Sequence, residues 1–334
     1  MSRVGDTLFF DTPVFVETWG TAVGTKEGEG PLGSYFDYIA RENRFGKKTW
    51  EQGERRMVEL ACDAALSRGG LTPSRLDCAL GGDLLNQCIS TAFAMRSMGL
   101  PYLGLYGACS TMAESLLLGS TLVSGGFARR ALCLASSHFC SAERQYRYPL
   151  EYGGQRPPSA QWTATACGAA VVCAHKTPVR ITAATIGRIH DPGVKDSANM
   201  GAAMAQSAYE TLRTFFRDSG TRPEDHDLLL TGDLAAIGRD IVIELFRRDG
   251  VALDDRYQDC GSLLFSREQD VHAGASGCGC SAAVLCGRIL PDLAAGKLKT
   301  VLFCGTGALM SPTSANQGET IPGICHLLRL EANA

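Results

Sequence analysis

The stretch Leu71-Thr-Pro-Ser-Arg-Leu-Asp-Cys-Ala-Leu-Gly-Gly-Asp-Leu84 occurs a second time as Thr221-Arg-Pro-Glu-Asp-His-Asp-Leu-Leu-Leu-Thr-Gly-Asp-Leu234, 150 residues further along the chain. In both copies a proline-marked turn is followed by a short apolar segment and then by Gly-Asp-Leu, which is typical of a turn, a buried strand and a loop. The positions that coincide are Pro73 with Pro223, Asp77 with Asp227, Leu80 with Leu230, Gly82 with Gly232, Asp83 with Asp233 and Leu84 with Leu234. The repeat therefore predicts that the same supersecondary unit is used twice.

The segments around each copy repeat as well. An amphipathic helix precedes each, with apolar residues at helical spacing from Met57 to Ala64 and from Met204 to Phe216. Further on, Gly107-Ala-Cys-Ser-Thr-Met-Ala113 corresponds to Cys278-Gly-Cys-Ser-Ala-Ala-Val284, and each leads into a helix and then a strand, 131–136 or 301–305. Chance reuse of a common pattern is the alternative, but two blocks in the same order argue against it.

This order predicts the fold class. Helices that alternate with strands indicate α/β structure with parallel sheets covered on both faces. We expect two αβ halves, residues 1–177 and 178–334, related by a pseudo-twofold axis, with a functional site where the halves meet. With 334 residues the chain is long enough to bury a sizeable core.

Composition excludes several classes of function. The net charge is −3, and a nucleic-acid binder needs a basic surface instead. No apolar run approaches the 20 or so residues that span a membrane, and the first ten residues lack the features of a secretory signal. We therefore expect a chain that stays inside the cell, where its 14 cysteines would be thiols.

Cys109 is the candidate reactive residue. It lies in a bend of small residues before the predicted helix 113–123. Unpaired backbone N–H groups and the positive end of the helix dipole favour a thiolate or a bound anion at such a place. The residue types thus fit a nucleophile or a carboxylate-binding site, and a buried packing cysteine is the alternative.

These residues resemble a known fold family. The run Gly107-Ala-Cys-Ser-Thr111, the repeat and the closing Val301-Leu-Phe-Cys-Gly-Thr-Gly-Ala-Leu309 are similar to thiolases and ketoacyl synthases, whose nucleophilic cysteine lies at such a bend. The resemblance implies a thiolase-like fold with two pseudo-twofold-related αβ halves in a layered αβαβα arrangement, and a homodimer.

A narrower resemblance covers the whole chain. It is similar to the stage V sporulation protein AD family, and the runs that carry the similarity are Trp19-Gly-Thr-Ala-Val-Gly-Thr-Lys-Glu-Gly-Glu-Gly-Pro-Leu-Gly33, Gly82-Asp-Leu-Leu-Asn-Gln87, Ala142-Glu-Arg-Gln-Tyr-Arg-Tyr-Pro149, Glu151-Tyr-Gly-Gly-Gln155 and Glu319-Thr-Ile-Pro322. This family resemblance implies sporulation and germination roles: binding of dipicolinic acid, and service in the machinery that transports it into the developing spore. The implied partners are membrane-embedded subunits of the stage V sporulation A machinery, with this chain peripheral on the cytoplasmic side of the forespore membrane.

We expect a ligand pocket rather than a catalytic centre. A condensing enzyme needs a histidine and a further histidine or asparagine to polarise the thioester and stabilise an oxyanion, and the two second-half loops predicted to lie there, 230–234 and 277–281, contain neither. The prediction is a non-enzymatic binder with no catalytic residues. The residues expected to line its pocket are Asp83, Asn86, Cys109, His138, Arg144 and Cys280.

Alternatives stay open for these residues. His138 could serve Cys109 as a base in an active acyltransferase, or could be a loop histidine bonded to backbone. Asp83 could face the pocket or cap a helix. Arg144, with Tyr146 and Tyr148 as flat walls, fits a planar dianion, or could belong to an ordered surface loop. Besides a ligand binder and an active acyltransferase, the third hypothesis is that the protein is a structural subunit with an empty pocket.

No resident cofactor or metal site is predicted, although calcium could accompany dipicolinate. The candidate zinc ligands Cys260, His272, Cys278 and Cys280 do not have the spacing of a structural zinc site. The glycine-rich run 274–279 is not followed by the Gly-Lys-Ser/Thr of a phosphate loop.

Overall fold

The computed structural model describes residues 1–146 and 156–333. The first half contains, in chain order, β1 (Ser2–Val4), β2 (Thr7–Val23), α1 (Thr25–Gly28), β3 (Tyr38–Ile39), α2 (Trp50–Arg68), β4 (Cys78–Gly82), α3 (Ile89–Met98), β5 (Tyr102–Gly104), α4 (Thr111–Ser124), β6 (Arg130–Ser137), α5 (Phe139–Tyr146), β7 (Trp162–Thr163) and β8 (Ala166–Cys173). The second contains β9 (Val179–Thr185), α6 (Met200–Ser219), β10 (Leu228–Thr231), α7 (Ala235–Arg248), β11 (Tyr257–Asp259), α8 (Cys260–Leu263), β12 (Ala275–Ser276), α9 (Cys278–Val284), α10 (Leu290–Ala294), β13 (Thr300–Ala308), α11 (Pro312–Asn316) and β14 (Gly323–Ala332).

The strand order is a palindrome about the boundary between β2 and β9. The hydrogen-bonded path runs β5-β4-β6-β8-β2 and continues as β9-β14-β13-β10-β11. Each strand of the first half thus has a counterpart at the mirrored position in the second, β4 with β10 and β6 with β13. The repeated sequence blocks end in these equivalent strands, so the predicted pseudo-twofold relation is present in the sheet topology.

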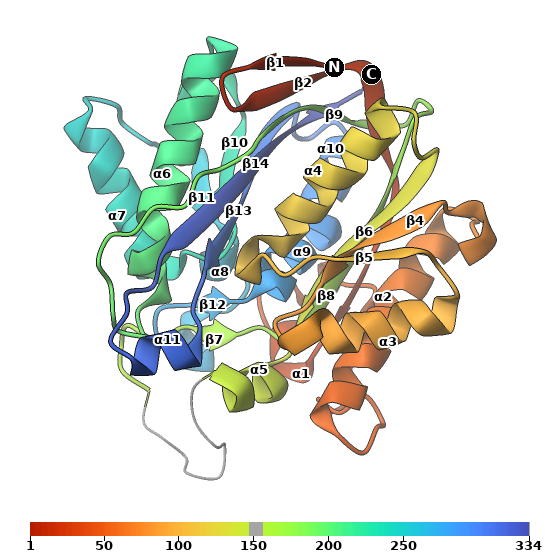
Figure 1. Ribbon diagram of the computed structural model, residues 1–334, viewed down its shortest axis with the longest axis horizontal. Helices are drawn as coiled ribbons and strands as arrows, with labels where there is room; N and C mark the ends of the chain where they lie inside the picture. The colour runs from red at the N-terminus through yellow and green to blue at the C-terminus, as the bar shows by residue number, and fades with distance from the viewer. Residues whose placement is uncertain (147–155, 334) are drawn as a thin grey trace.

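The helices complete a layered arrangement. Helices α4 and α9 lie in the middle and contact strands of both halves, whereas α2 and α3 cover strands of the first half and α6 covers β13 and β14 (Figure 1). Every residue of α9 is buried, so this helix lies inside the core between the two halves of the sheet. The layered thiolase-like arrangement predicted from the sequence is confirmed.

Asp77 and Asp227 show how the repeat dictates local structure. Each precedes its strand, and its carboxylate accepts two backbone N–H bonds from the strand beside it. Asp77 accepts from the N–H groups of residues 129 and 130 at 2.6 and 3.0 Å. Asp227 accepts from those of residues 299 and 300 at 2.6 and 3.0 Å. The repeated aspartates therefore hold equivalent strand starts in register.

The expectation of parallel sheets is wrong for part of the sheet. Strands β5, β4 and β6 are parallel, as are β11, β10 and β13. The pairs β6–β8, β8–β2, β13–β14, β14–β9 and β2–β9 are antiparallel. Strands β13 and β14 follow each other in the chain through residues 309–322 and pair directly, and antiparallel neighbours need no crossover connection.

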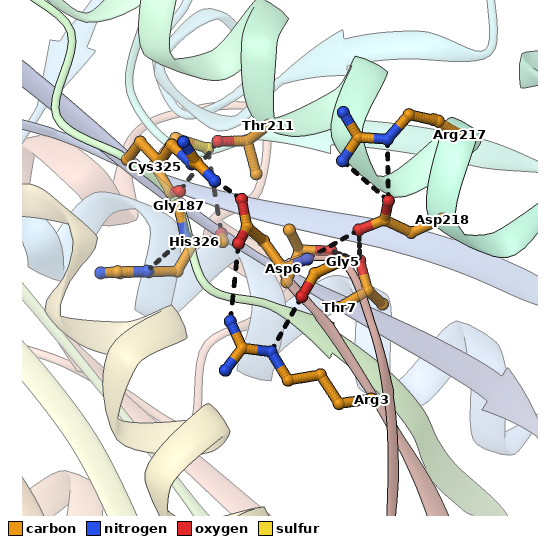
Figure 2. Close-up of polar contacts among 12 residues, drawn as sticks. Arg3, Gly5, Asp6, Thr7, Gly187, Thr211, Arg217, Asp218, Cys325 and His326 are labelled. Atoms are coloured by element: carbon orange, nitrogen blue, oxygen red, sulfur yellow. Dashed lines mark hydrogen bonds and ion pairs between the residues drawn. The ribbon is translucent and has the colours of Figure 1, made fainter.

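The N-terminal hairpin is tied to the second half by Asp218, the penultimate residue of α6 (Figure 2). Its carboxylate accepts from the backbone N–H of Asp6 and the hydroxyl of Thr7, both at 3.0 Å, and from Arg217. Gly5, at the turn, has φ of 56°, and a Cβ there would lie 2.5 Å from the Asp218 carboxylate. This network fixes the start of β2 where β2 meets β9.

Among residues 1–146 and 156–333, no helix combines the length and the apolar character needed to cross a membrane. The predicted boundary between residues 177 and 178 falls in the connection from β8 to β9. Whether the halves are separate units stays a prediction.

Candidate functional site

Cys109 lies at a strained bend one turn before α4. Ala108, the residue before it, has φ of 51°, in the left-handed region that residues with a Cβ seldom adopt. The bend is held by the hydroxyl of Ser110, which donates to the carbonyl of Gly107 at 2.7 Å. Backbone strain of this kind often occurs at functional sites, where the surrounding structure enforces it. The bend leaves the Cys109 side chain half-buried.

The thiol of Cys109 faces the carboxyl group of Asp233, in the loop after β10. This carboxyl group is fully buried and accepts from Thr306 at 2.7 Å, from Ser276 at 2.9 Å and from the backbone N–H of Gly277 at 2.9 Å. The Cys109 thiol lies close enough to this carboxyl group for each to affect the pKa of the other. The second-half loops named from the sequence thus do surround Cys109, with an acid where a condensing enzyme needs a base.

This environment raises the pKa of Cys109. Burial is the main cause, and the neighbouring negative charge of Asp233 adds to it, since both disfavour a thiolate. The pKa of Asp233 is itself raised by burial. This shift runs against the prediction that the helix start promotes a thiolate at Cys109, because burial and, after it, the adjacent Asp233 both favour the protonated thiol.

A small cavity of about 60 Å³ opens beside Cys109. A cavity of about 150 Å³ accommodates benzene, and dipicolinate has about twice as many heavy atoms. The cavity as it stands has room for water but not for the expected ligand. Its lining is mostly apolar and consists of Leu84, Ala108, Cys109, Ala142, Tyr146, Thr163, Met200, Ser276, Ala308 and Met310.

His138 is buried directly after β6, and both of its ring nitrogens have backbone partners. Nδ1 accepts from the N–H of Cys140 at 3.2 Å, which leaves Nε2 as the donor to the carbonyl of Asn43 at 2.7 Å. Burial lowers the pKa of this imidazole. The geometry agrees with the interpretation of His138 as a loop histidine bonded to backbone, not as a base for Cys109.

Asp83 is also fully buried, and its carboxylate points toward α3. It accepts from the backbone N–H of Leu85 at 2.9 Å, and from the N–H and hydroxyl of Thr91 at 2.8 and 2.7 Å. The repeat equates Asp83 with Asp233, yet only Asp233 reaches Cys109. Asp83 instead shapes the loop from β4 to α3, which carries Asn86.

Asn86 and Arg144 lie together at a shallow surface depression of about 430 Å³. The backbone N–H of Asn86 donates to the Gln145 side chain at 3.0 Å, and the Arg144 guanidinium pairs with Glu51. The depression is lined by Glu51, Leu85, Asn86, Gln87, Ile89, Ser141, Arg144 and Gln145.

Two tyrosines lie between this depression and the cavity. The hydroxyls of Tyr106 and Tyr146 are 2.6 Å apart, and Tyr146 donates to the carbonyl of Leu84 at 2.5 Å. Tyr106 also donates to the side chain of Asn86 at 3.3 Å. Tyr146 lines the Cys109 cavity, and its role as a flat wall for the ligand stays a prediction. The other candidate wall, Tyr148, and the rest of segment 147–155 lie outside the described residues.

Cys280, in α9, is fully buried with its thiol 3.9 Å from the carbonyl of Gly232. Burial raises its pKa, and the nearby Asp233 and Cys109 add to the effect. Cys109 and Cys280, both expected to line the pocket, are thus close enough for Cys109 to affect the pKa of Cys280.

Sequence reasoning missed Glu54 of α2, which is fully buried near Asp83. Its carboxyl group accepts from Ser141 at 2.8 Å, Ser136 at 3.2 Å and Ser90 at 3.4 Å. Burial and the adjacent Asp83 raise its pKa to about 8. The sequence did contain a signal for this residue. Glu54 lies on the apolar stripe of a predicted helix, four residues before Val58, where a buried acid is unusual.

Solved structures confirm the class of fold. The chain is similar to the cerulenin-bound OleA of Xanthomonas campestris, with a TM-score of 0.64 and 12% identity over 99% of this chain and 100% of that one. It is also similar to 3-oxoacyl-[acyl-carrier-protein] synthase III of Aquifex aeolicus (TM-score 0.57, 13% identity, 95% and 99% covered) and to human mitochondrial 3-ketoacyl-CoA thiolase (TM-score 0.57, 13% identity, 96% and 99% covered). The protein has a thiolase-like fold.

Comparison of sequences assigns the chain to a family. The profile of the stage V sporulation protein AD family matches residues 5–331. The stage V sporulation protein AD of Bacillus subtilis (strain 168) is 45% identical over 320 residues, which cover 96% of this chain and 95% of the relative. The chain belongs to the stage V sporulation protein AD family.

Proposed function

We propose that this protein binds dipicolinate and does not catalyse a condensation. The observation that carries the second half of this proposal is the pairing of the Cys109 thiol with the buried acid Asp233. A nucleophilic cysteine needs a base that removes its proton, and among the described residues that line the Cys109 cavity there is no histidine, lysine or arginine. Dipicolinate as the ligand follows from the family resemblance.

The depression beside Arg144 supports the binding role. Its volume of about 430 Å³ exceeds that of a benzene-sized cavity, and Arg144 and Asn86 supply donors for a carboxylate. Arg144 is paired with Glu51, but both side chains are partly exposed, at 49% and 35%. Exposed ion pairs contribute only about 0–1 kcal/mol, so a dianionic ligand can displace Glu51 at small cost. Tyr146 lines the neighbouring Cys109 cavity, and the hydroxyl of Tyr106 connects it to Asn86 of the depression.

The assembly is also a proposal. We infer a homodimer that forms through β5, which in the described residues pairs with β4 alone. Leu103 of β5 is 51% exposed, and Phe93 of α3 and Tyr106 are 40% and 51% exposed. An unpaired edge with apolar side chains favours pairing with another chain. Sedimentation of the protein and of a Leu103→Lys variant tests this, and a wild-type monomer would contradict it.

The family further implies membrane-embedded partners of the stage V sporulation A machinery. We propose that the protein serves that machinery as a peripheral subunit on the cytoplasmic side of the forespore membrane, where it hands dipicolinate to the embedded subunits. Co-purification of the tagged protein with those subunits from sporulating cells tests this proposal.

Calorimetric titration with dipicolinate, with and without calcium, tests the binding function, and related pyridine carboxylates serve as controls. Cys109→Ser should keep most of the affinity because no covalent step is involved. Absence of binding would favour a purely structural subunit. In a second measurement, acyl-thioesters are added and the intact mass is recorded. Acyl mass on Cys109 would contradict the proposal and favour an acyltransferase.

A further inference from the structure

Three side chains with metal-ligating atoms meet where the two halves of the chain connect. Glu17 comes from β2, Cys173 is the last residue of β8, and His175 lies in the connection from β8 to β9. The sulfur, the imidazole nitrogen and a carboxylate oxygen all lie within 4.8 Å of one another. This cluster is far from Cys109 in the sequence and has no part in the function proposed above.

The separations suit a zinc ion. The Cys173 sulfur is 3.9 Å from Nε2 of His175, and this nitrogen is 3.3 Å from Oε1 of Glu17. Bonds of about 2.3 Å to sulfur and about 2.0–2.2 Å to nitrogen and oxygen, in tetrahedral geometry, place ligand atoms roughly 3.3–3.6 Å apart. Small side-chain rotations would bring the three atoms to these values.

A β-bulge directs Glu17 to the cluster. In the pairing of β2 with β8, Val16 lies opposite Val172 and Thr18 opposite Val171, so Glu17 is the extra residue. Bulges re-aim a side chain in this way and are common next to functional sites. Without the bulge, Glu17 would occupy a regular ladder position instead.

Arg130, which lies opposite Cys173 in β6, holds the same carboxylate. Its Nε donates to Oε2 of Glu17 at 2.6 Å, and its terminal nitrogen donates to Oε1 at 3.1 Å. Ligating carboxylates are usually oriented by such hydrogen bonds. Arg130 therefore contacts both oxygens of Glu17 and holds Oε2 at the shorter distance, so Oε1 is the oxygen that would turn to a metal ion.

We propose that Glu17, Cys173 and His175 bind a zinc ion through Oε1, Sγ and Nε2. Thiolate, imidazole and carboxylate together favour zinc among common divalent ions. The Cys173 thiol, which now donates to the carbonyl of His175 at 3.3 Å, loses its proton to solvent when the Zn–S bond forms. Water completes the coordination, because the His175 side chain is 49% exposed.

The ion would tie the connection 174–178 to both β2 and β8. This connection is already held by the hydroxyl of Thr177, which donates to the carbonyl of Val16 at 2.7 Å. Zinc would therefore stabilise the joint between the two halves, by an amount that grows with the ratio of free zinc to its dissociation constant.

Cobalt titration of the chelator-treated protein tests the site, because a Co²⁺–thiolate bond gives an ultraviolet charge-transfer band. The wild type should show this band at one equivalent of Co²⁺, zinc should abolish it, and zinc should raise the melting temperature. His175→Ala, at an exposed position that tolerates the change, should weaken zinc binding at least tenfold. Cys173→Ser should remove the band, and Glu17→Gln should weaken binding.

The matched controls are Cys140→Ser, at a half-buried thiol outside the cluster, and His272→Ala, at another exposed histidine. Both should bind cobalt and zinc as the wild type does. The proposal is overturned if the wild type shows no thiolate band. It is equally overturned if His175→Ala and Cys173→Ser bind zinc as tightly as these controls, since the metal would then be held by other residues.

Discussion

The thiol of Cys109 lies next to the carboxyl group of Asp233 and the two groups shift each other's pKa, although the residues belong to different halves of the molecule. Asp233 has the place in the second repeat that Asp83 has in the first. Asp83 turns its carboxylate to α3, so the pseudo-twofold relation of the backbone does not extend to these side chains. The contact arises because the bend before α4 and the loop after β10 meet at the interface of the halves.

This contact predicts that the Cys109 thiol reacts slowly with alkylating agents. Burial and Asp233 raise the pKa of Cys109, and alkylation needs the thiolate. During brief treatment with iodoacetamide at pH 7.5, Cys109 should not be the first cysteine labelled, and its labelling rate should still be rising at pH 9. Peptide mass spectrometry measures the rate for each cysteine.

Asp233→Asn should accelerate labelling of Cys109 severalfold, because it removes the negative charge next to the thiol. Asp240→Asn, at an exposed position of α7, is the matched control and should leave the rate unchanged. Fast labelling of Cys109 in the wild type at pH 7.5 would show that α4 does activate this residue.

The fold was predictable from the sequence because the repeat is preserved where backbone structure depends on it. Asp77 and Asp227 hold equivalent strand starts, and Pro73 and Pro223 begin equivalent turns. The antiparallel strands were not predictable in this way. Strand direction depends on how a connection crosses the sheet, and helix–strand alternation does not report it.

The candidate site was predictable only in part. Cys109 was found because a bend before a helix has a recognisable pattern of small residues. The roles of Asp83 and Asp233 could not be separated, since each follows a strand with Gly-Asp-Leu, and side-chain direction depends on partners such as Thr91 and Thr306 that lie outside the repeat. Glu54 was missed because its partners come from three separate segments.

The Asp83→Asn variant distinguishes two roles of Asp83 in ligand binding: positioning the loop that carries Asn86, or contacting the ligand through calcium. The Asp83 carboxylate accepts bonds from Leu85 and Thr91, so it positions the loop that carries Asn86. An amide there would place a donor against these N–H groups and should cost about 1–3 kcal/mol of stability. Dipicolinate affinity should fall both with and without calcium. A loss confined to the calcium condition would show instead that Asp83 acts through the cation.

Glu54 predicts a pH dependence of stability. Its pKa is raised from 4.5 to about 8 in the folded state. The folded protein therefore binds more protons than the unfolded chain between these values, and stability is lost as pH rises through this window. The contribution of Glu54 should approach about 1.4 kcal/mol per pH unit between pH 5.5 and 7.5.

Urea unfolding at several pH values measures this slope. Glu54→Gln should flatten it, whereas Glu59→Gln, at a partly buried glutamate of the same helix that is paired with Arg55 and Arg56, should not. Burial also raises the pKa of Asp259, to about 7. Asp259 therefore contributes to the pH dependence with the same sign, and this contribution remains in the Glu54→Gln variant. An unchanged slope in Glu54→Gln would mean that Glu54 is ionised in the folded protein.

The ion pair between Arg144 and Glu51 makes the sharpest test of the ligand site. If dipicolinate takes the guanidinium from Glu51, Arg144→Ala should weaken binding at least tenfold, because a charge-assisted hydrogen bond is worth about 1.5–3 kcal/mol. Glu51→Gln should have the opposite effect and strengthen binding several-fold, since it frees Arg144 and removes a negative charge that repels the ligand.

Calcium reverses the expected effect of Glu51→Gln. If the cation bridges Glu51 and a ligand carboxylate, Glu51→Gln should strengthen binding without calcium and weaken it with calcium. Arg248→Ala, a paired arginine at the end of α7, controls for the loss of a surface charge and should leave both affinities unchanged. Calorimetry of the three variants under both conditions gives the comparison. Equal affinities in Arg144→Ala and Arg248→Ala would place dipicolinate elsewhere on the protein, since only Arg144 borders the depression.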